Sequence, residues 1–116
     1  MQYLLMLYVN EAAWPKLTKA EQDQGMAAYM AYSEALKKAN VYVGSNRLRP
    51  ASTATTVRVT EGQSQVLDGP YPDLKEQLGG YFLIEVPDLD GALSWAARCP
   101  GAHHGVVEVR PVWTRD

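Results

Sequence analysis

The turn Asp68-Gly69-Pro70-Tyr71-Pro72 carries the side chain with the clearest capacity for chemistry. Aspartate is common in turns because its carboxylate accepts hydrogen bonds from nearby backbone N–H groups, such as that of Tyr71. The same carboxylate can act as a general base when it lies at the mouth of an apolar cleft. The sequence leaves both roles open for Asp68, a structural turn residue or a proton acceptor.

Lys75 and Glu76 follow this turn closely and form an adjacent charge pair. Such a pair is often solvated at a short helical turn, where it contributes little to stability. Alternatively, Lys75 could hold an anionic substrate while Glu76 orients that substrate or closes the pocket. The spacing alone does not decide between these two interpretations.

Charged residues also interrupt apolar segments that have the composition of strands, namely Arg58, Glu85, Glu108 and Arg110. Arg58, Glu108 and Arg110 alternate with valines, and the period of two in a strand puts them on the face opposite to those valines. We expect the valine faces to meet the helices and the charges to lie on an open sheet face. There the charges form either ion pairs at an interface or a polar lining for a carboxylate ligand, which arginine binds through two parallel hydrogen bonds.

Histidines and aromatic residues are the remaining candidates. His103 and His104 lie in a predicted loop and have no metal-ligand spacing with other His, Cys or acidic residues, so we expect no metal and no cofactor. His104 is the better candidate for proton transfer. Tyr81, with Tyr8 and Trp14, could line an aromatic pocket, although such side chains more often pack in a core or an interface.

The hydrophobic pattern of the first 40 residues predicts a strand, a loop and a helix. The short apolar run Gln2–Val9 is typical of a strand buried on both faces. A loop follows over Asn10–Leu17, which contains a proline. Thr18 and Glu21 have capping-box spacing and begin a helix over about Lys19–Ala39, with an apolar stripe that includes Met26, Met30 and Leu36. Asn40 is placed to close this helix in a left-handed conformation.

The remainder of the chain predicts a hairpin, further strands and a second helix. Glu61-Gly62 is a tight hairpin turn. Asp88 is a good N-cap for a helix with Leu89, Ala92, Leu93, Ala96 and Cys99 on one face, which Pro100-Gly101 ends. The predicted extended segments are Val41–Leu48, Ala54–Thr60, Gln63–Leu67, Tyr81–Val86 and Val106–Val112.

This order of elements predicts one α+β domain over residues 1–116 with a ferredoxin-like split βαβ sheet and an extra hairpin. The strands Gln2–Val9 and Tyr81–Val86 should lie at its centre. The helices cover only one face of such a sheet. Because a large apolar patch is rare on a soluble monomer, the open face should be covered by a partner or a ligand, and we expect a homodimer.

Composition narrows the class of protein. The 116 residues are 47% hydrophobic and 21% charged, which is typical of a soluble globular domain. Eleven basic and thirteen acidic side chains give a net charge of −2, which argues against a nucleic-acid partner. The N-terminal apolar run of about seven residues is too short to span a bilayer. It also lacks the features of a signal peptide, and Cys99 has no disulfide partner in the chain, so we expect a cytoplasmic protein without a membrane partner.

Several ordered motifs resemble the YCII-related family, in the branch called DGPF-domain proteins. They are Asp68-Gly69-Pro70-Tyr71, the run Lys75-Glu76-Gln77-Leu78-Gly79-Gly80-Tyr81-Phe82-Leu83-Ile84-Glu85-Val86, Ala54-Thr55-Thr56-Val57-Arg58, Trp95-Ala96-Ala97-Arg98, and Gly105-Val106-Val107-Glu108-Val109-Arg110-Pro111-Val112. The resemblance implies a dimeric α/β-barrel variant of the ferredoxin-like fold. It also implies a distant relation to small-molecule lyases and isomerases, in which a buried Asp, sometimes paired with His, is the suspected acid/base. Members of this branch are often linked to alternative sigma factors.

The chain departs from the family pattern at three places. Tyr71 replaces the phenylalanine of the branch name. Pro72, Asp73 and Leu74 stand where relatives have a small residue, an acid and a hydroxyl. No histidine precedes His103, so an Asp–His pair could form only with His103 or His104.

These observations predict a homodimeric enzyme of lyase or isomerase type that acts on a small anionic organic molecule. Asp68 would be the base, His104 a possible acid, and Arg58 and Lys75 the groups that hold the anion. The other expected substrate-binding residues are Glu76, Tyr81, Glu108 and Arg110. The alternative is a non-catalytic ligand-binding or regulatory module linked to transcription or the stress response.

Overall fold

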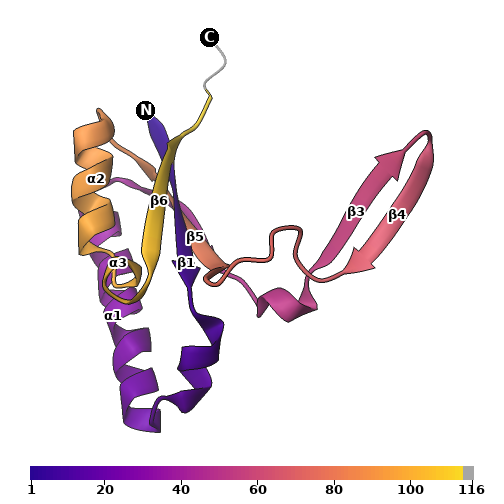
Figure 1. The fold of residues 1–116 in the computed structure, drawn as a ribbon. Helices are drawn as coiled ribbons and strands as arrows, with labels where there is room; N and C mark the ends of the chain where they lie inside the picture. Colours follow the sequence, from indigo (N-terminus) through magenta and orange to yellow (C-terminus); the bar gives the residue numbers. More distant parts are fainter. Residues whose placement is uncertain (114–116) are drawn as a thin grey trace.

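A four-stranded antiparallel sheet forms the body of the protein. The computed structural model describes residues 1–113. The strands lie in the order β2 (Tyr42–Arg47), β5 (Gln77–Glu85), β1 (Gln2–Val9) and β6 (Val106–Pro111). The helices α1 (Lys19–Lys38) and α2 (Leu89–Arg98) cover one face of this sheet (Figure 1). This order is the predicted ferredoxin-like arrangement, with β1 and β5 at the centre.

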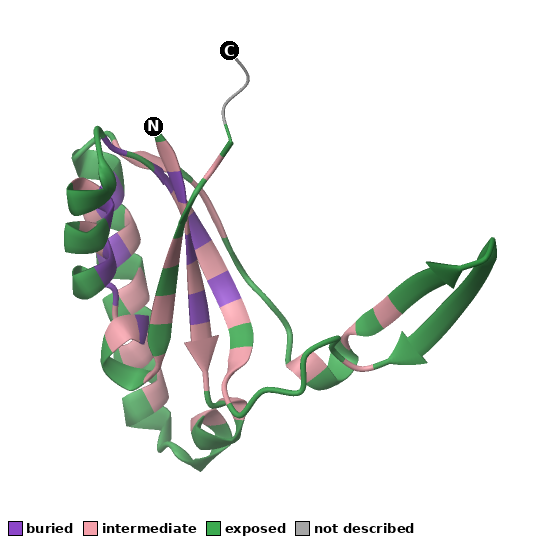
Figure 2. Ribbon diagram, turned by 45° about the horizontal axis from the view of Figure 1, so that its top comes forward, coloured by how far each residue is buried: buried purple, intermediate pink, exposed green. Residues whose placement is uncertain are grey.

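The core lies between this sheet and the two helices. Alternate residues of the central strands are buried, which are Tyr3, Leu5 and Leu7 on β1 and Phe82 and Ile84 on β5. Figure 2 shows the same alternation of buried and half-buried positions along these strands. Neither α1 nor α2 covers the other face of the sheet, and in residues 1–113 its side chains are only half-buried or exposed.

Local capping signals fix the ends of the helices. The Glu21 backbone N–H donates to Thr18 Oγ1 at 3.1 Å, and the Thr18 N–H donates to Glu21 Oε1 at 2.9 Å. The latter bond holds the pKa of the Glu21 carboxyl below its ordinary value. Asn40 closes α1 with a φ of 58°, as predicted. Asp88 caps α2 by accepting the Gly91 N–H at 2.9 Å.

The prediction that Met26 and Met30 belong to the core was wrong. Their exposed fractions are 43% and 68%, whereas Tyr32 and Leu36 are buried. An α-helix turns by roughly 100° per residue, so the stripe through Tyr29, Tyr32 and Leu36 points away from the two methionines. Leu89 and Leu93 of α2 are likewise exposed, because the small residues of that helix are the ones that approach the sheet.

Three local predictions need correction. The segment predicted as a loop contains a 3-10 helix, η1 (Glu11–Lys16), that accommodates its proline. The strand β5 begins at Gln77, four residues before the predicted start at Tyr81. The two histidines lie in a short helix, α3 (Gly101–His104), rather than in a loop. In residues 1–113, no helix is both long and apolar enough to cross a membrane.

The hairpin of β3 (Thr55–Thr60) and β4 (Gln63–Asp68) forms a separate two-stranded sheet. We call this hairpin the arm. It projects from the side of the main sheet opposite to the helices (Figure 1). Its turn has positive φ at Glu61 (50°) and Gly62 (77°), which suits the right-handed twist of a hairpin. The expected burial of its valines against the helices was wrong, because β3 does not join the main sheet.

Candidate functional site

Polar and apolar side chains alternate in rows across the open face of the main sheet. Met6 on β1 is paired with Tyr81 on β5 and with Glu108 on β6. In the next row, Leu4 is paired in the same way with Leu83 and Arg110. These pairings bring together three of the predicted site residues, Tyr81, Glu108 and Arg110, which we call the sheet group.

Two short contacts order the sheet group. The Asn46 Nδ2–H group donates to Tyr81 Oη at 2.7 Å. Arg110 pairs with Glu108 at 3.0 Å, from Nη2 to Oε1, and both side chains remain exposed. A solvated pair of this kind adds little stability, but it leaves guanidinium N–H groups available to an anion. Asn46 was not predicted, although strand alternation along β2 could have placed it on this face.

Glu76 and His104 lie at the end of the sheet where β6 begins. A side chain at Gly105 would collide with the Tyr8 carbonyl oxygen, and its Cβ would lie 3.3 Å from Glu76 Oε2. The Glu76 carboxylate is therefore next to the backbone that follows His104. His104 is exposed, whereas the Nε2 atom of His103 is 3.2 Å from the Ala97 carbonyl oxygen of α2. His103 therefore has a structural contact, and His104 is the one nearer to β6.

Arg58 and Asp68 lie on opposite faces of the arm. Arg58 is paired with Gln65, and Asp68 is paired with Thr55. Because side chains alternate along each strand, these two cross-strand pairs point in opposite directions. The Arg58 guanidinium lies over the Tyr71 ring, 5.5 Å from its centroid. The expectation that Arg58 lies with Glu108 and Arg110 on the open sheet face was therefore wrong.

Asp68 ends β4 at the root of the arm and is exposed. Within residues 1–113, its carboxylate accepts no hydrogen bond, so the predicted turn role is not seen. The turn is held instead by Gly69 and Thr56. The Gly69 N–H donates to the Ala54 carbonyl oxygen at 2.7 Å, and Thr56 Oγ1 donates to the Gly69 carbonyl oxygen at 2.7 Å. The Asp68 carboxylate is left with its acceptor positions open.

Lys75 is exposed in the irregular segment between β4 and β5, and Glu76 next to it is half-buried. The alternative of a short helical turn at this pair is not seen. The predicted site residues thus fall into two separate sets within one chain. The sheet group has Glu76 and His104 at its edge, whereas Asp68 and Arg58 belong to the arm.

Glu11 joins the root of the arm to the main sheet and was not predicted as a functional residue. Its two carboxylate oxygens accept the Ala51 N–H at 2.9 and 3.0 Å, and its own N–H donates to Gln77 Oε1 at 3.3 Å. Ala51 begins the short helix η2 (Ala51–Thr53), which leads into the arm. No local pattern could have revealed this contact, since its partners lie 40 and 66 residues away along the chain.

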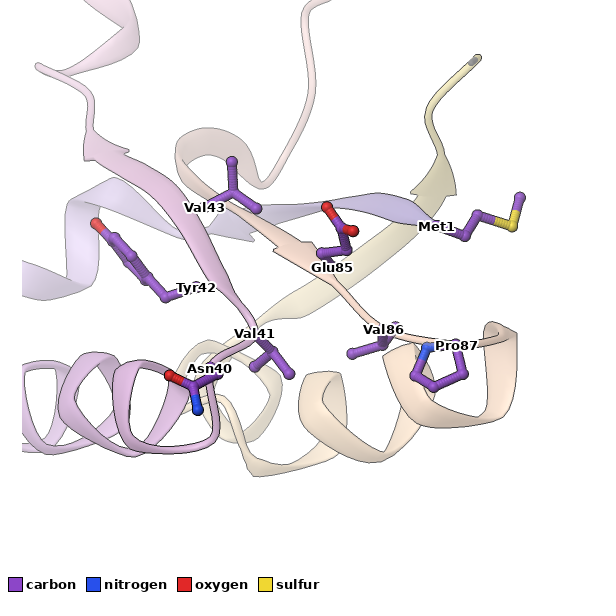
Figure 3. Close-up of a pocket in the computed structure, with 8 residues that line it drawn as sticks. All are labelled: Met1, Asn40, Val41, Tyr42, Val43, Glu85, Val86 and Pro87. Carbon is purple, nitrogen blue, oxygen red and sulfur yellow. The ribbon is translucent and has the colours of Figure 1, made fainter. Parts of the chain in front are cut away.

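Two open hollows lie on the surface of the described residues, and of the candidate residues named from the sequence only Glu85 lines one of them. A hollow of about 320 Å³ lies beside the root of the arm and includes the Glu11 and Asp73 carboxylates among its lining. Another of about 580 Å³ lies at the end of the sheet where the first helix leads into β2 (Figure 3). Its lining residues are Met1, Asn40, Val41, Tyr42, Val43, Glu85, Val86 and Pro87. In residues 1–113, no three His, Cys, Asp or Glu side chains gather as metal ligands.

The predicted aromatic pocket does not form from all three of its members. Tyr8 and Tyr81 lie on the open sheet face, but Trp14 is elsewhere. A Cβ at Gly25 of α1 would lie 3.3 Å from the Trp14 ring, and the Arg47 guanidinium lies 5.1 Å from the centroid of that ring. Trp14 therefore packs against α1 instead of lining the open face.

Comparisons with known proteins agree with this fold. A protein of Rhizobium meliloti (strain 1021), described only as uncharacterised, is 33% identical over 114 residues, which are 97% of this chain and 92% of that protein. A solved structure with a similar fold is 5-chloro-2-hydroxyhydroquinone dehydrochlorinase (TftG) from Burkholderia phenoliruptrix AC1100, in complex with 2,5-dihydroxybenzoquinone. It has 18% sequence identity and a TM-score of 0.56, and the match covers all of this chain and 96% of that one. This likeness supports a ferredoxin-like fold of the type found in dimeric α/β-barrels.

The sequence profile of the YCII-related domain matches residues 1–115, almost the entire chain. That match and the identity to the Rhizobium protein confirm the resemblance at the level of the family. The chain belongs to the YCII-related domain family.

Proposed function

We propose that this protein is a small-molecule enzyme of lyase or isomerase type that acts as a homodimer on an anionic organic substrate. The main support for the proposal is the composition of the open sheet face. Its polar residues are Tyr81, Glu108 and Arg110, and its apolar neighbours are Leu4, Met6 and Leu83. Ligand sites are mostly apolar surfaces with a few placed polar groups, and this face has that composition. The Arg110 guanidinium supplies the donors that an anion requires.

The reaction class is supported by the similar fold of TftG, a dehydrochlorinase whose solved structure holds 2,5-dihydroxybenzoquinone. Dehydrochlorination is an elimination, in which a base takes a proton, the freed electron pair forms a new double bond and chloride leaves with its bonding pair. A carboxylate with open acceptor positions can perform the first of these steps. We assign this role to Asp68 and the return of a proton to His104, with Arg110 and Lys75 holding the anion.

The surface area of one chain supports the homodimer. The accessible area is 8489 Å² for a chain of 12.8 kDa. A compact monomer of that mass exposes roughly 6,300 Å², so the chain exposes roughly 2,200 Å² in excess. The radius of gyration of 16.2 Å also exceeds the roughly 13 Å expected of a compact domain of this length. A second chain that covers the open face would remove this excess.

The proposal is tested with two probes. Binding of 2,5-dihydroxybenzoquinone is followed by thermal shift, and turnover of 5-chloro-2-hydroxyhydroquinone is followed by chloride release. If the chlorinated probe is turned over, Asp68→Asn should lower kcat/KM by about 100-fold or more, since a general base contributes roughly 10²–10⁴ in rate. Asp73→Asn, a nearby exposed carboxylate, is the matched control and should leave the rate unchanged. Full activity of Asp68→Asn would show that Asp68 is not the base.

A non-catalytic binding or regulatory module is the second candidate. It is favoured by the separation of Asp68 on the arm from His104 and the sheet group, because one chain by itself has no complete acid/base pair. In that case small carboxylates or the quinone would raise the melting temperature without any turnover. A co-purifying protein, together with no response to any of these ligands, would favour a regulatory role instead.

A further inference from the structure

We propose that the site is shared between two chains, with the arm of one chain lying on the open sheet face of a second copy. Asp68 of one chain then joins Tyr81, Glu108 and Arg110 of the other. This inference rests on the homodimer of the proposed function and adds which surfaces meet and which residues each chain contributes.

One face of the arm is apolar and carries Asp68. Val57 is paired with Val66, Val59 with Ser64, and Thr55 with Asp68, so all six side chains point the same way. We call Val57, Val59 and Val66 the valine face. Their exposed fractions are 61%, 62% and 63%, which is unusual for three clustered valines in water.

The other face of the arm is mainly polar. It carries Thr56, Arg58, Thr60, Gln63, Gln65 and a single large apolar residue, Leu67. This difference between the faces indicates which one is covered in the assembled protein. Since Asp68 lies two residues from Val66 on the same strand, a surface that covers the valines also approaches the Asp68 carboxylate.

Within residues 1–113, nothing covers the valine face. Figures 1 and 2 show the arm standing clear of the main sheet and of both helices. A two-stranded hairpin is marginally stable in water and needs further packing on one face. The valine face therefore requires a surface from another molecule.

A second copy of this chain is the occupant that the surface areas favour. The excess of roughly 2,200 Å² per chain is more than the roughly 800 Å² that each partner buries in a standard interface, and it is in the range of obligate homodimers. The second copy offers a matching apolar surface on its open face, with Leu4, Met6 and Leu83. A two-fold axis repeats the contact, so both arms and both sheet faces are covered at once.

This arrangement explains why the predicted site is divided within one chain. The candidate base is on the arm, and the candidate anion-binding group is on the sheet. Docking would bring the Asp68 carboxylate of one chain and the Arg110 guanidinium of the other to the same partly apolar interface. Neither chain would have to change its fold.

The first test places a photo-crosslinker on each face of the arm. Val66 or Gln65 is replaced by p-benzoylphenylalanine in full-length chains, and isotopically light and heavy chains are mixed before irradiation. The Val66 position should give adducts between light and heavy chains that map to β1, β5 or β6. Gln65, its neighbour on the polar face, should give few such adducts. Adducts from Val66 that fall within one chain, that map to the helices, or that do not form would overturn the proposal.

The second test weakens the contact with a charge. Val66→Asp should raise the dissociation constant of the dimer at least tenfold in sedimentation equilibrium, whereas Gln65→Asp should change it little. Because the arm lies outside the core, this substitution should leave the main sheet and its helices folded. The circular dichroism spectrum and the melting temperature of the dissociated variant chain check this. Equal dimer affinity of Val66→Asp and the unmodified protein would contradict docking through the valine face.

The outcomes separate this inference from the proposed function. If the protein dimerises but the arm does not crosslink to the partner's sheet, the shared site is refuted and the homodimer of the proposed function stands. If the protein stays monomeric at all concentrations, both the shared site and the proposed homodimer are refuted. Crosslinking as expected, with neither binding nor turnover of the probes, supports the shared interface and counts against the enzyme.

Discussion

Glu11 shows how one carboxylate can determine the position of a distant segment. Both of its oxygens accept the same backbone N–H, that of Ala51, and its own N–H donates to Gln77. These contacts connect the end of β1, the start of η2 and the start of β5. The root of the arm, and with it Asp68, is therefore held in place by a residue that does not belong to the arm.

We expect Glu11→Ala to loosen the root of the arm. The substitution leaves the Ala51 N–H without its charged acceptor, which should lower the free energy of unfolding by about 1–2 kcal/mol. Amide hydrogen exchange at Ala51 should become markedly faster. Glu34→Ala is the matched control, since the contact of Glu34 with Lys37 is a long and exposed 3.9 Å. Unchanged exchange at Ala51 would show that this contact does not hold the arm.

At the scale of elements, the helices are defined by short local signals. The capping box of α1 satisfies two backbone N–H groups within four residues of the chain. At the start of α2, the Asp88 side chain satisfies one such group, the Gly91 N–H. These ends depend on residues that are neighbours in the sequence, which is why they were predicted to within a residue.

Thr18→Ala should therefore destabilise the protein by about 1 kcal/mol, the usual effect of losing an N-cap side chain. Urea unfolding measures this change. Ser94→Ala, at an exposed position inside α2, is the comparison and should be neutral or slightly stabilising because alanine has the higher helix propensity. A Thr18→Ala protein as stable as the unmodified one would mean that packing alone fixes this end of α1.

At the scale of the whole molecule, burial makes three groups in or against the core, Tyr29, Tyr32 and Cys99, harder to ionise in the folded protein. Burial, reinforced by the neighbouring Cys99 and partly opposed by Arg47, raises the pKa of Tyr29 to about 12. Burial also raises the pKa of Tyr32 and of the Cys99 thiol, although backbone hydrogen bonds from Gly101 and Ala102 oppose the rise at Cys99. In the unfolded chain these groups ionise at about pH 8.5–10, well before they ionise in the folded protein.

Stability should therefore be complete below about pH 8 and decrease as the pH rises through 9 to 12, because only the unfolded state loses protons there. For each group the decrease should be less than about 1.4 kcal/mol per pH unit, since Tyr29 is only half-buried. Urea unfolding at pH 8 and at pH 10.5 measures it. Tyr29→Phe removes one of the ionising groups and should make the decrease shallower. A slope that Tyr29→Phe does not change would show that Tyr29 contributes nothing to it.

The sequence by itself determined the class of fold, the ends of α1 and the start of α2. The apolar runs of β1 and β5, the capping residues of α1 and α2, and the Glu61-Gly62 turn act between residues that are close in the chain. The alternation of charge and valine on β6 also predicted correctly which side of that strand faces the helices.

Only the tertiary structure decided how the candidate site is divided. The separation of the arm from the main sheet, the opposite directions of Arg58 and Asp68, and the link from Glu11 to Ala51 depend on strand pairing and on contacts across many residues. The buried face of α1 was also decided by the tertiary structure. The predicted apolar stripe is displaced by about one residue along the helix, so that its members Met26 and Met30 face water. Periodicity shows which side chains share a face of one element, but it does not show which other surface that face will meet.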